Sequence, residues 1–273
     1  MPVARTGHLL RPMILDASCH ISFHADAPVP LVMMLRPRSG YGQWVMREEY
    51  ALDPHVPVVE ATDPFGNLFQ RIVAPPGFFS IRCACRVETA DFIDVAPWAG
   101  LVPIEWLPEP VLQFLLPSRY CQSDLLNSLA TSIVGEMPVG YQQVAVIAHW
   151  LRTQLTYTYG STNASTSALD TVNTRAGVCR DYAHLGIALC RSLNIPARMV
   201  VGYLHLLKPM NLHAWFEAYV GGRWYVFDGT QDQPRGNRIA IAYGRDAADV
   251  ALITQFGMLY DLTMQVEVGE ARL

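Results

Sequence analysis

A pair of glycines in the C-terminal third of the chain restricts how one stretch of the sequence can fold. Residues 211–230 read NLHAWFEAYVGGRWYVFDGT, two β-rich runs that flank Gly221-Gly222. A Gly-Gly pair suits the positive φ angles of a two-residue hairpin turn. The sequence therefore predicts two antiparallel strands whose register places Val220 opposite Arg223.

This predicted register brings two chemically useful side chains together. It puts Trp215 opposite Asp228, so that His213 lies on the same face as Asp228 and is its diagonal neighbour. Diagonal Cβ atoms in such a ladder are about 7–8 Å apart or somewhat less, which allows an imidazole–carboxylate hydrogen bond. A slip of one residue would place the two groups on opposite faces. We therefore expect His213 and Asp228 to form a pair.

A cysteine lies upstream in the stretch RAGVCRDYAH, residues 175–184. Apolar residues recur after it at helical spacing and Pro196 ends the pattern, so we expect a helix from Cys179 to Asn194. Its apolar side is formed by Tyr182, Leu185, Leu189 and Leu193. The free N–H groups and the macrodipole at a helix start lower the pKa of a thiol and can stabilise an oxyanion. Gly177 is expected to permit the sharp turn into this helix.

Cys179, His213 and Asp228 are together the groups that nucleophilic acyl transfer requires: a thiolate, an imidazole and a carboxylate that orients the imidazole. Each residue alone has a simpler interpretation. The cysteine can be a buried packing thiol, as Cys190 in the same helix is expected to be, the histidine can bond to backbone, and the aspartate can begin a turn. A structural zinc site requires four ligands, often supplied as closely spaced pairs of Cys or His, and none of these three residues belongs to such a pair. We expect no metal and no cofactor.

The N-terminal part of the chain has a different pattern. Residues 14–95 contain short β-rich runs separated by turn signals. Within SIRCACRVE, residues 80–88, apolar and polar side chains alternate, which predicts a half-buried antiparallel strand. Cys83 and Cys85 then lie on one face, which suits packing better than a disulfide. An antiparallel β-sandwich-like domain is the expected architecture.

Five prolines lie between residues 96 and 120, and we interpret this segment as a crossover on the surface. Beyond it, helical patterns begin, the first with Ser123 or Asp124 as its expected N-cap. The predicted fold class is therefore α+β. Residues 1–120 form the N-terminal β-rich domain with its proline-rich crossover, and residues 121–273 form the second domain.

Composition restricts the partners. The chain is 51% hydrophobic and only 16% charged, with a net charge of −4 and no basic run. This excludes the electrostatic footprint of a nucleic-acid-binding protein and favours burial of an apolar face in a homo-oligomer. The longest apolar run, residues 28–35, is far shorter than the ~18 residues that span a bilayer, so we expect no membrane partner. The first 19 residues are interpreted as mature sequence, and six sparse cysteines favour a reducing cytoplasm.

Three separated blocks of the sequence resemble a known family. GVCRDYAHLGIALCRSLNIPARMVVGYLH, HAWFEAYVGGRWYVFDGT and AIAYGRDAADV are similar to bacterial transglutaminase-like proteins, which are described as cysteine proteases with a papain-related core. The resemblance covers about residues 125–260, with the three key residues in the order Cys, His, Asp. The β-rich segment before it resembles the N-terminal domain of such proteins. The resemblance implies a helix that bears the cysteine and packs on an antiparallel sheet.

The resemblance also implies roles for the residues. Cys179 is the expected nucleophile, His213 the general base and acid, and Asp228 the residue that orients His213. An oxyanion site at the Cys179 backbone N–H is expected on both grounds. Tyr157 and Tyr159 are candidate side-chain donors to it, but packing in the core or in the wall of the site is the favoured interpretation for both.

Several other residues near these motifs receive more modest interpretations. Trp215 either shields the imidazole–carboxylate pair from water or packs in the core. Arg180 and Asp181 are interpreted as structural support, since an acidic residue in a first helical turn suits the macrodipole. The late block is expected to form a salt-bridged structural corner, and it contains Arg245, Asp246 and Asp249.

The expected function is a thiol-dependent acyl transfer in which Cys179 attacks an amide or peptide carbonyl and water resolves the acyl-enzyme. A peptide or protein is the expected substrate of this cysteine peptidase or amidase. Transglutamination uses the same intermediate and differs only in the nucleophile admitted, so it stays an alternative. A catalytically silent binding or scaffold protein is the alternative from another class.

Overall fold

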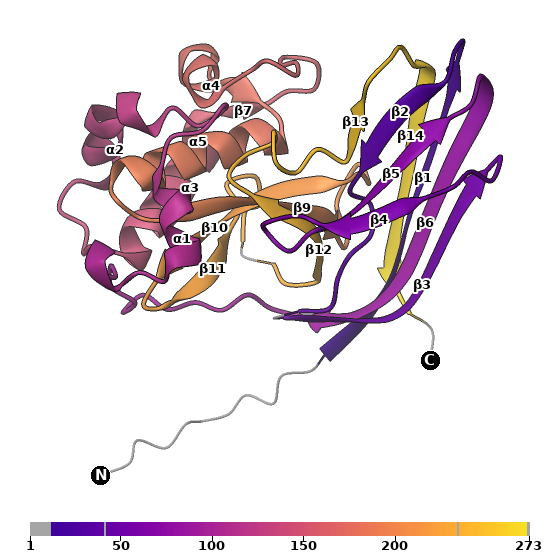
Figure 1. The fold of residues 1–273 in the computed structure, drawn as a ribbon. Helices are drawn as coiled ribbons and strands as arrows, with labels where there is room; N and C mark the ends of the chain where they lie inside the picture. Colours follow the sequence, from indigo (N-terminus) through magenta and orange to yellow (C-terminus); the bar gives the residue numbers. More distant parts are fainter. Residues whose placement is uncertain (1–11, 41, 234, 272–273) are drawn as a thin grey trace.

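The computed structural model describes residues 12–40, 42–233 and 235–271 of the chain. Most of the N-terminal stretch interpreted as mature sequence, residues 1–11, lies outside them. The described chain forms two units side by side, a β-sandwich and a helix-covered sheet (Figure 1). None of the helices in the described ranges has both the length and the hydrophobicity needed to cross a membrane.

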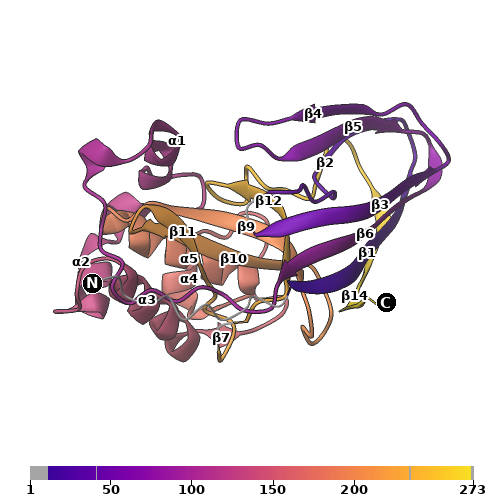
Figure 2. The same ribbon diagram turned by 90° about the horizontal axis from the view of Figure 1, so that it is seen from below.

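The sandwich consists of two four-stranded antiparallel sheets that face each other (Figure 2). The first has the order β14-β1-β6-β3, with bounds Tyr260–Glu270, Pro12–Ala25, Gly77–Ala90 and Gln43–Asp53. The second has the order β13-β2-β5-β4, with bounds Ile253–Gln255, Val29–Met33, Leu68–Ala74 and Val59–Thr62. Alternate residues of β1 and β6 are buried between the sheets, as period-2 patterning predicts. Cys83 and Cys85 are both free and buried on this inner face, so they pack as predicted.

The predicted extent of the second domain, residues 121–273, is corrected by the structure. Residues 121–273 do not all stay in the second unit, because β14 pairs with β1 and β13 pairs with β2. The chain thus returns to the sandwich after residue 252. Without these strands β1 and β2 would expose unpaired backbone groups at the sheet edges.

The second unit carries an antiparallel sheet of order β11-β10-β9-β12, with bounds Arg223–Phe227, His213–Val220, Ala197–Leu204 and Arg238–Gly244. Helices cover one face of it (Figure 2): α2 (Asn127–Val134), α3 (Tyr141–Gln154), α4 (Ala168–Thr174) and α5 (Cys179–Ser192). Helix α5 lies against β10 so closely that a Cβ at Gly186 would be 2.6 Å from the Phe216 ring. The predicted cysteine helix on an antiparallel sheet is therefore present, although it ends two residues before Asn194.

The start predicted at Ser123 is only a 3-10 turn, η3 (Ser123–Leu125), and α2 follows without a side-chain cap. The proline-rich crossover also contains short helices, namely η1 (Ile104–Trp106), α1 (Glu109–Leu112) and η2 (Gln113–Leu115). It is fixed to the hairpin, because Gly221 N–H donates to the Gly100 carbonyl at 2.8 Å. The crossover is thus a packed layer rather than a free linker.

The sandwich holds the outer edge of β12. The Gln43 side-chain amide accepts a hydrogen bond from the Ala240 N–H at 2.8 Å and donates one to the Ala240 carbonyl at 2.9 Å. The Asn67 side-chain amide makes the same two kinds of hydrogen bond with the backbone of Tyr243. Thr89 Oγ1 donates to the Arg238 carbonyl at 2.8 Å. These side chains satisfy backbone groups that an edge strand would leave unpaired. The sandwich thereby determines where the side chains of β12 lie.

Candidate active site

The glycine hairpin has the predicted register. Val220 pairs with Arg223 and Phe216 with Phe227, and both turn glycines have positive φ. As a result, Nε2 of His213 lies 2.8 Å from Oδ2 of Asp228, and both side chains are buried. The predicted contact between these two residues is therefore present.

Two residues that the sequence did not reveal hold Asp228 in place. Thr230 donates to Oδ1 from its backbone N–H at 3.0 Å and from Oγ1 at 2.7 Å. Arg238 donates from Nη2 to Oδ2 at 2.9 Å and is itself buried. Burial alone would raise the pKa of Asp228, but the charges of His213 and Arg238 hold it well below its usual range. Asp228 is thus an ionised carboxylate with a fixed orientation.

Cys179 begins α5 and is the single cysteine of the six that is not fully buried. Its thiol lies close enough to His213 for the imidazole to lower its pKa. Burial raises the pKa of this thiol, but the adjacent imidazole of His213 and its positive charge outweigh that effect, and the pKa falls below its usual value. Burial also lowers the pKa of His213, yet the charge and hydrogen bond of Asp228 raise it to about 9. Both shifts favour a thiolate–imidazolium pair.

The geometry assigns separate tasks to the two ring nitrogens of His213. Nε2 is engaged by Asp228, which leaves Nδ1 for Cys179. A carboxylate that holds one nitrogen fixes the ring orientation and stabilises the protonated imidazole. The arrangement can therefore keep a nucleophile deprotonated and deliver a proton to a leaving group.

The start of α5 is fixed by Asp181, which is completely buried. Its Oδ2 accepts from the Val178 N–H at 2.8 Å and from Thr162 Oγ1 at 2.7 Å, and Arg180 pairs with Oδ1 at 2.8 Å. Arg180 and Asp181 thus support the helix start as predicted. Gly177 is required for a different reason than predicted, because a Cβ there would lie 2.7 Å from Cβ of Asp181. The constraint is space rather than an unusual φ angle.

The structure places Tyr157 beside the cysteine. Its strand β7 (Thr156–Tyr157) pairs with β8 (Ala176–Gly177), two residues before Cys179. Burial raises the pKa of Tyr157, and the nearby backbone N–H of Cys179 opposes this shift. Tyr159 is more exposed and packs edge-on against Tyr157, with ring centroids 5.3 Å apart. Tyr157 therefore lies near the start of α5, and Tyr159 packs on Tyr157.

Trp215 is buried and forms one wall of the pair. Its ring stacks on His213 with centroids 6.3 Å apart, and the Arg238 guanidinium lies 4.9 Å above it. It also packs with Val200 and Ala240. Trp215 therefore belongs to a small apolar cluster and lies against the imidazole.

The late block forms the expected salt-bridged corner. Arg245 pairs with Asp249 at 2.9 Å. Asp246 is buried and accepts from the Tyr120 backbone N–H at 2.7 Å, which ties the end of the crossover to this corner. His184 of α5 accepts from the Ala247 N–H at 3.1 Å, and burial lowers its pKa to about 3. These contacts buttress α5, and no group of three His, Cys, Asp or Glu side chains among the described residues is arranged to hold a metal ion.

The comparisons with known proteins agree with this architecture. Residues 127–229 match the model of the transglutaminase-like superfamily. The crystal structure of a "Putative Cysteine Protease from Cytophaga hutchinsonii" superposes with a TM-score of 0.89 at 37% identity, over 96% of this chain and 92% of that one. An uncharacterized protein of Mycobacterium tuberculosis is 36% identical over 78% of this chain and 68% of its own length. One of Mycobacterium leprae is 38% identical over 40% of this chain, and that match spans 42% of its own length.

Proposed function

Since the chain belongs to the transglutaminase-like superfamily, we propose that it is a thiol-dependent acyl-transfer enzyme, and first of all a cysteine peptidase or amidase. One observation carries the proposal: Cys179, the one cysteine not fully buried, lies beside a histidine that lowers the pKa of its thiol, and Nε2 of this histidine lies 2.8 Å from a buried carboxylate. A packing thiol does not require this arrangement. The substrate class that fits it is a peptide or another amide.

The proposed reaction has two stages. The Cys179 thiolate forms a bond to the carbonyl carbon, and the C–N bond breaks as imidazolium His213 gives its proton to the leaving amine. Water then attacks the thioester and gives a proton to His213, and the thiolate leaves as the free acid is released. Asp228 stays ionised throughout and stabilises the imidazolium.

The carbonyl oxygen becomes negatively charged in each tetrahedral intermediate. The Cys179 backbone N–H at the start of α5 is the proposed donor to it. The Tyr157 hydroxyl, which lies near this N–H, is proposed to donate to the same oxyanion. Trp215 excludes water from the side of His213 that it covers.

Transamidation is the second candidate, because an amine can replace water in the last stage. The experiment uses acetyl-glutaminyl-glycinamide with and without methylamine, with the products identified by mass spectrometry. We expect release of a free acid that depends on Cys179, whether the side-chain or the backbone amide is hydrolysed. A methylamide as the sole product would favour transamidation, and no product from a panel of peptides and amides would favour the catalytically silent scaffold.

We also propose that the protein works in a reducing compartment, the cytoplasm. All six cysteines are free thiols, as a cytoplasmic protein would have.

A further inference from the structure

A polar pocket of about 650 Å³ lies between the loop that follows β9 and the segment between β11 and β12. Thr230 lines this pocket and also donates to Oδ1 of Asp228, whereas His213 is bound to Oδ2. The pocket wall is thus one side chain away from the carboxylate of the proposed site. Its volume is in the usual range of ligand pockets.

Two residues of the wall carry buried polar atoms that have no hydrogen-bond partner among the described residues. They are Nδ1 of His205 and Oδ1 of Asn237. The His205 side chain belongs to a residue only 8% exposed, so little solvent reaches it. The two residues are neighbours, since His205 N–H donates to the Asn237 carbonyl at 3.1 Å. An unpaired buried polar atom is costly, so a ligand that supplies hydrogen bonds here is bound favourably.

The charges at the rim indicate what kind of ligand fits. Lys208 and Arg235 contribute two positive charges, and Asp91 and Asp232 contribute two negative ones. A ligand of either net charge meets repulsion as well as attraction, whereas a neutral polar ligand meets neither. Asn237 Oδ1 accepts only, so the ligand must offer an N–H donor. The peptide group is neutral and carries such a donor.

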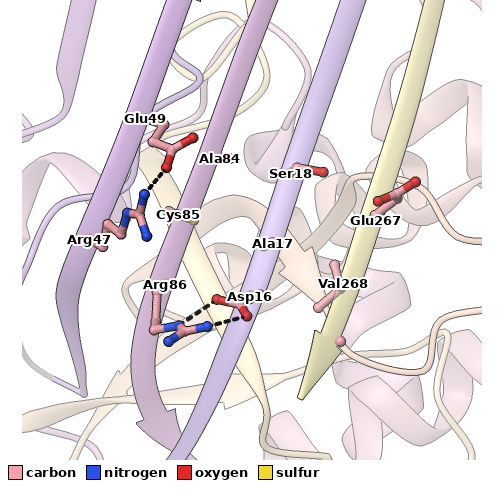
Figure 3. A pocket seen from close by; sticks show the side chains of 11 residues that line it. Asp16, Ala17, Ser18, Arg47, Glu49, Ala84, Cys85, Arg86, Glu267 and Val268 are labelled. Atoms are coloured by element: carbon pink, nitrogen blue, oxygen red, sulfur yellow. Dashed lines mark hydrogen bonds and ion pairs between the residues drawn. The ribbon is translucent and has the colours of Figure 1, made fainter. Parts of the chain in front are cut away.

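A second pocket differs from this one because most of its charged side chains form ion pairs with each other. It lies on the outer face of the first sandwich sheet, and Figure 3 shows one ion pair between β1 and β6 and a second along β3. Arg86 contacts Asp16 at 2.7 Å, and Arg47 pairs with Glu49. Four of its five charged side chains are therefore already paired, and Glu267 is the fifth.

From this geometry, and on the basis of the proposed function, we propose that the pocket beside Thr230 is a substrate subsite that binds an uncharged polar peptide segment of the acyl donor. Asn237 accepts a hydrogen bond from a peptide N–H, and His205 supplies a second contact. The subsite therefore determines substrate specificity without touching the reacting atoms.

Binding is tested in a Cys179→Ala protein, in which no chemistry occurs. The probe is acetyl-glutaminyl-glycinamide, titrated while the Asn237 side-chain amide and His205 ring signals are followed by NMR. We expect saturable shifts of these signals. The substitution Asn237→Gly removes the side chain at a positive φ of 56° that glycine tolerates, and we expect affinity to fall about tenfold. His205→Phe keeps a ring of similar shape and is expected to weaken binding in the same direction.

His20→Ala, on the exposed face of the sandwich, is the matched control and leaves binding unchanged. In enzyme with Cys179 intact, Asn237→Gly should raise KM about tenfold with little change in kcat. Unchanged affinity in both pocket variants, no saturable binding, or tighter binding of a lysyl or glutamyl probe overturns the subsite. None of these binding results would contradict the proposed reaction at Cys179. Conversely, a lack of turnover in the protein with Cys179 intact would not contradict binding at the subsite.

Discussion

Cys179→Ser should reduce turnover of any accepted amide substrate by a factor on the order of 10⁴ or more. The serine hydroxyl has a much higher pKa than the thiol, so the nearby His213 imidazole that lowers the pKa of Cys179 does not generate a comparable nucleophile. Cys179 is half-buried and the change is nearly isosteric, so the fold should remain. The measurement is kcat together with the urea unfolding midpoint.

Cys190→Ala is the matched control for this variant. Cys190 lies on the same helix but is fully buried, and burial raises the pKa of its thiol. This variant should keep its kcat and lose only packing stability. If Cys179→Ser kept its activity while Cys190→Ala lost it, the nucleophile would be wrongly assigned.

Asp228→Asn should lower kcat by about 10³- to 10⁴-fold with little change in KM. The carboxamide has the size of the carboxylate but removes the negative charge that stabilises imidazolium His213. It also leaves buried Arg238, which donates to Asp228 at 2.9 Å, without a counter-charge. A loss of about 3 kcal/mol in the free energy of unfolding should accompany the loss of activity.

Adding Arg238→Met to Asp228→Asn separates the two effects. The double variant removes the uncompensated charge and should recover stability but not kcat. Glu49→Gln is the control, because the Glu49 side chain is 58% exposed and its contact with Arg47 is a surface one on the sandwich. Full activity in Asp228→Asn would contradict the orienting role of the carboxylate.

Local sequence signals predicted the parts of the site that depend on local structure. Gly221-Gly222 set the hairpin register, and this register was sufficient to bring His213 to Asp228. The apolar spacing after Cys179 predicted its helix. The sequence Asp228-Gly229-Thr230 is typical of a turn in which the aspartate carboxylate accepts a hydrogen bond from the backbone N–H two residues later, and Thr230 donates such a bond. Thr230 could therefore have been identified from sequence.

Arg238 could not be found in this way. Its side chain reaches Asp228 because β12 pairs with β9 and because Gln43, Asn67 and Thr89 of the sandwich hold the outer edge of β12. These contacts join residues that are far apart in the sequence and follow no local periodicity. The return of β13 and β14 to the sandwich has the same cause, since β1 and β14 are separated by almost the whole chain.

The central claim is that Cys179 and His213 form an activated pair, and the rate of alkylation by iodoacetamide as a function of pH tests it most directly. The five other cysteines are buried, so the folded protein should react at Cys179, as peptide mapping would show. The rate should rise as pH rises through a pKa below that of an ordinary cysteine. In His213→Ala the thiol loses the imidazole, and burial, the largest influence that remains, raises its pKa, so the rise should move to above the ordinary value. A wild-type profile with the ordinary cysteine pKa that does not change in His213→Ala would contradict the account.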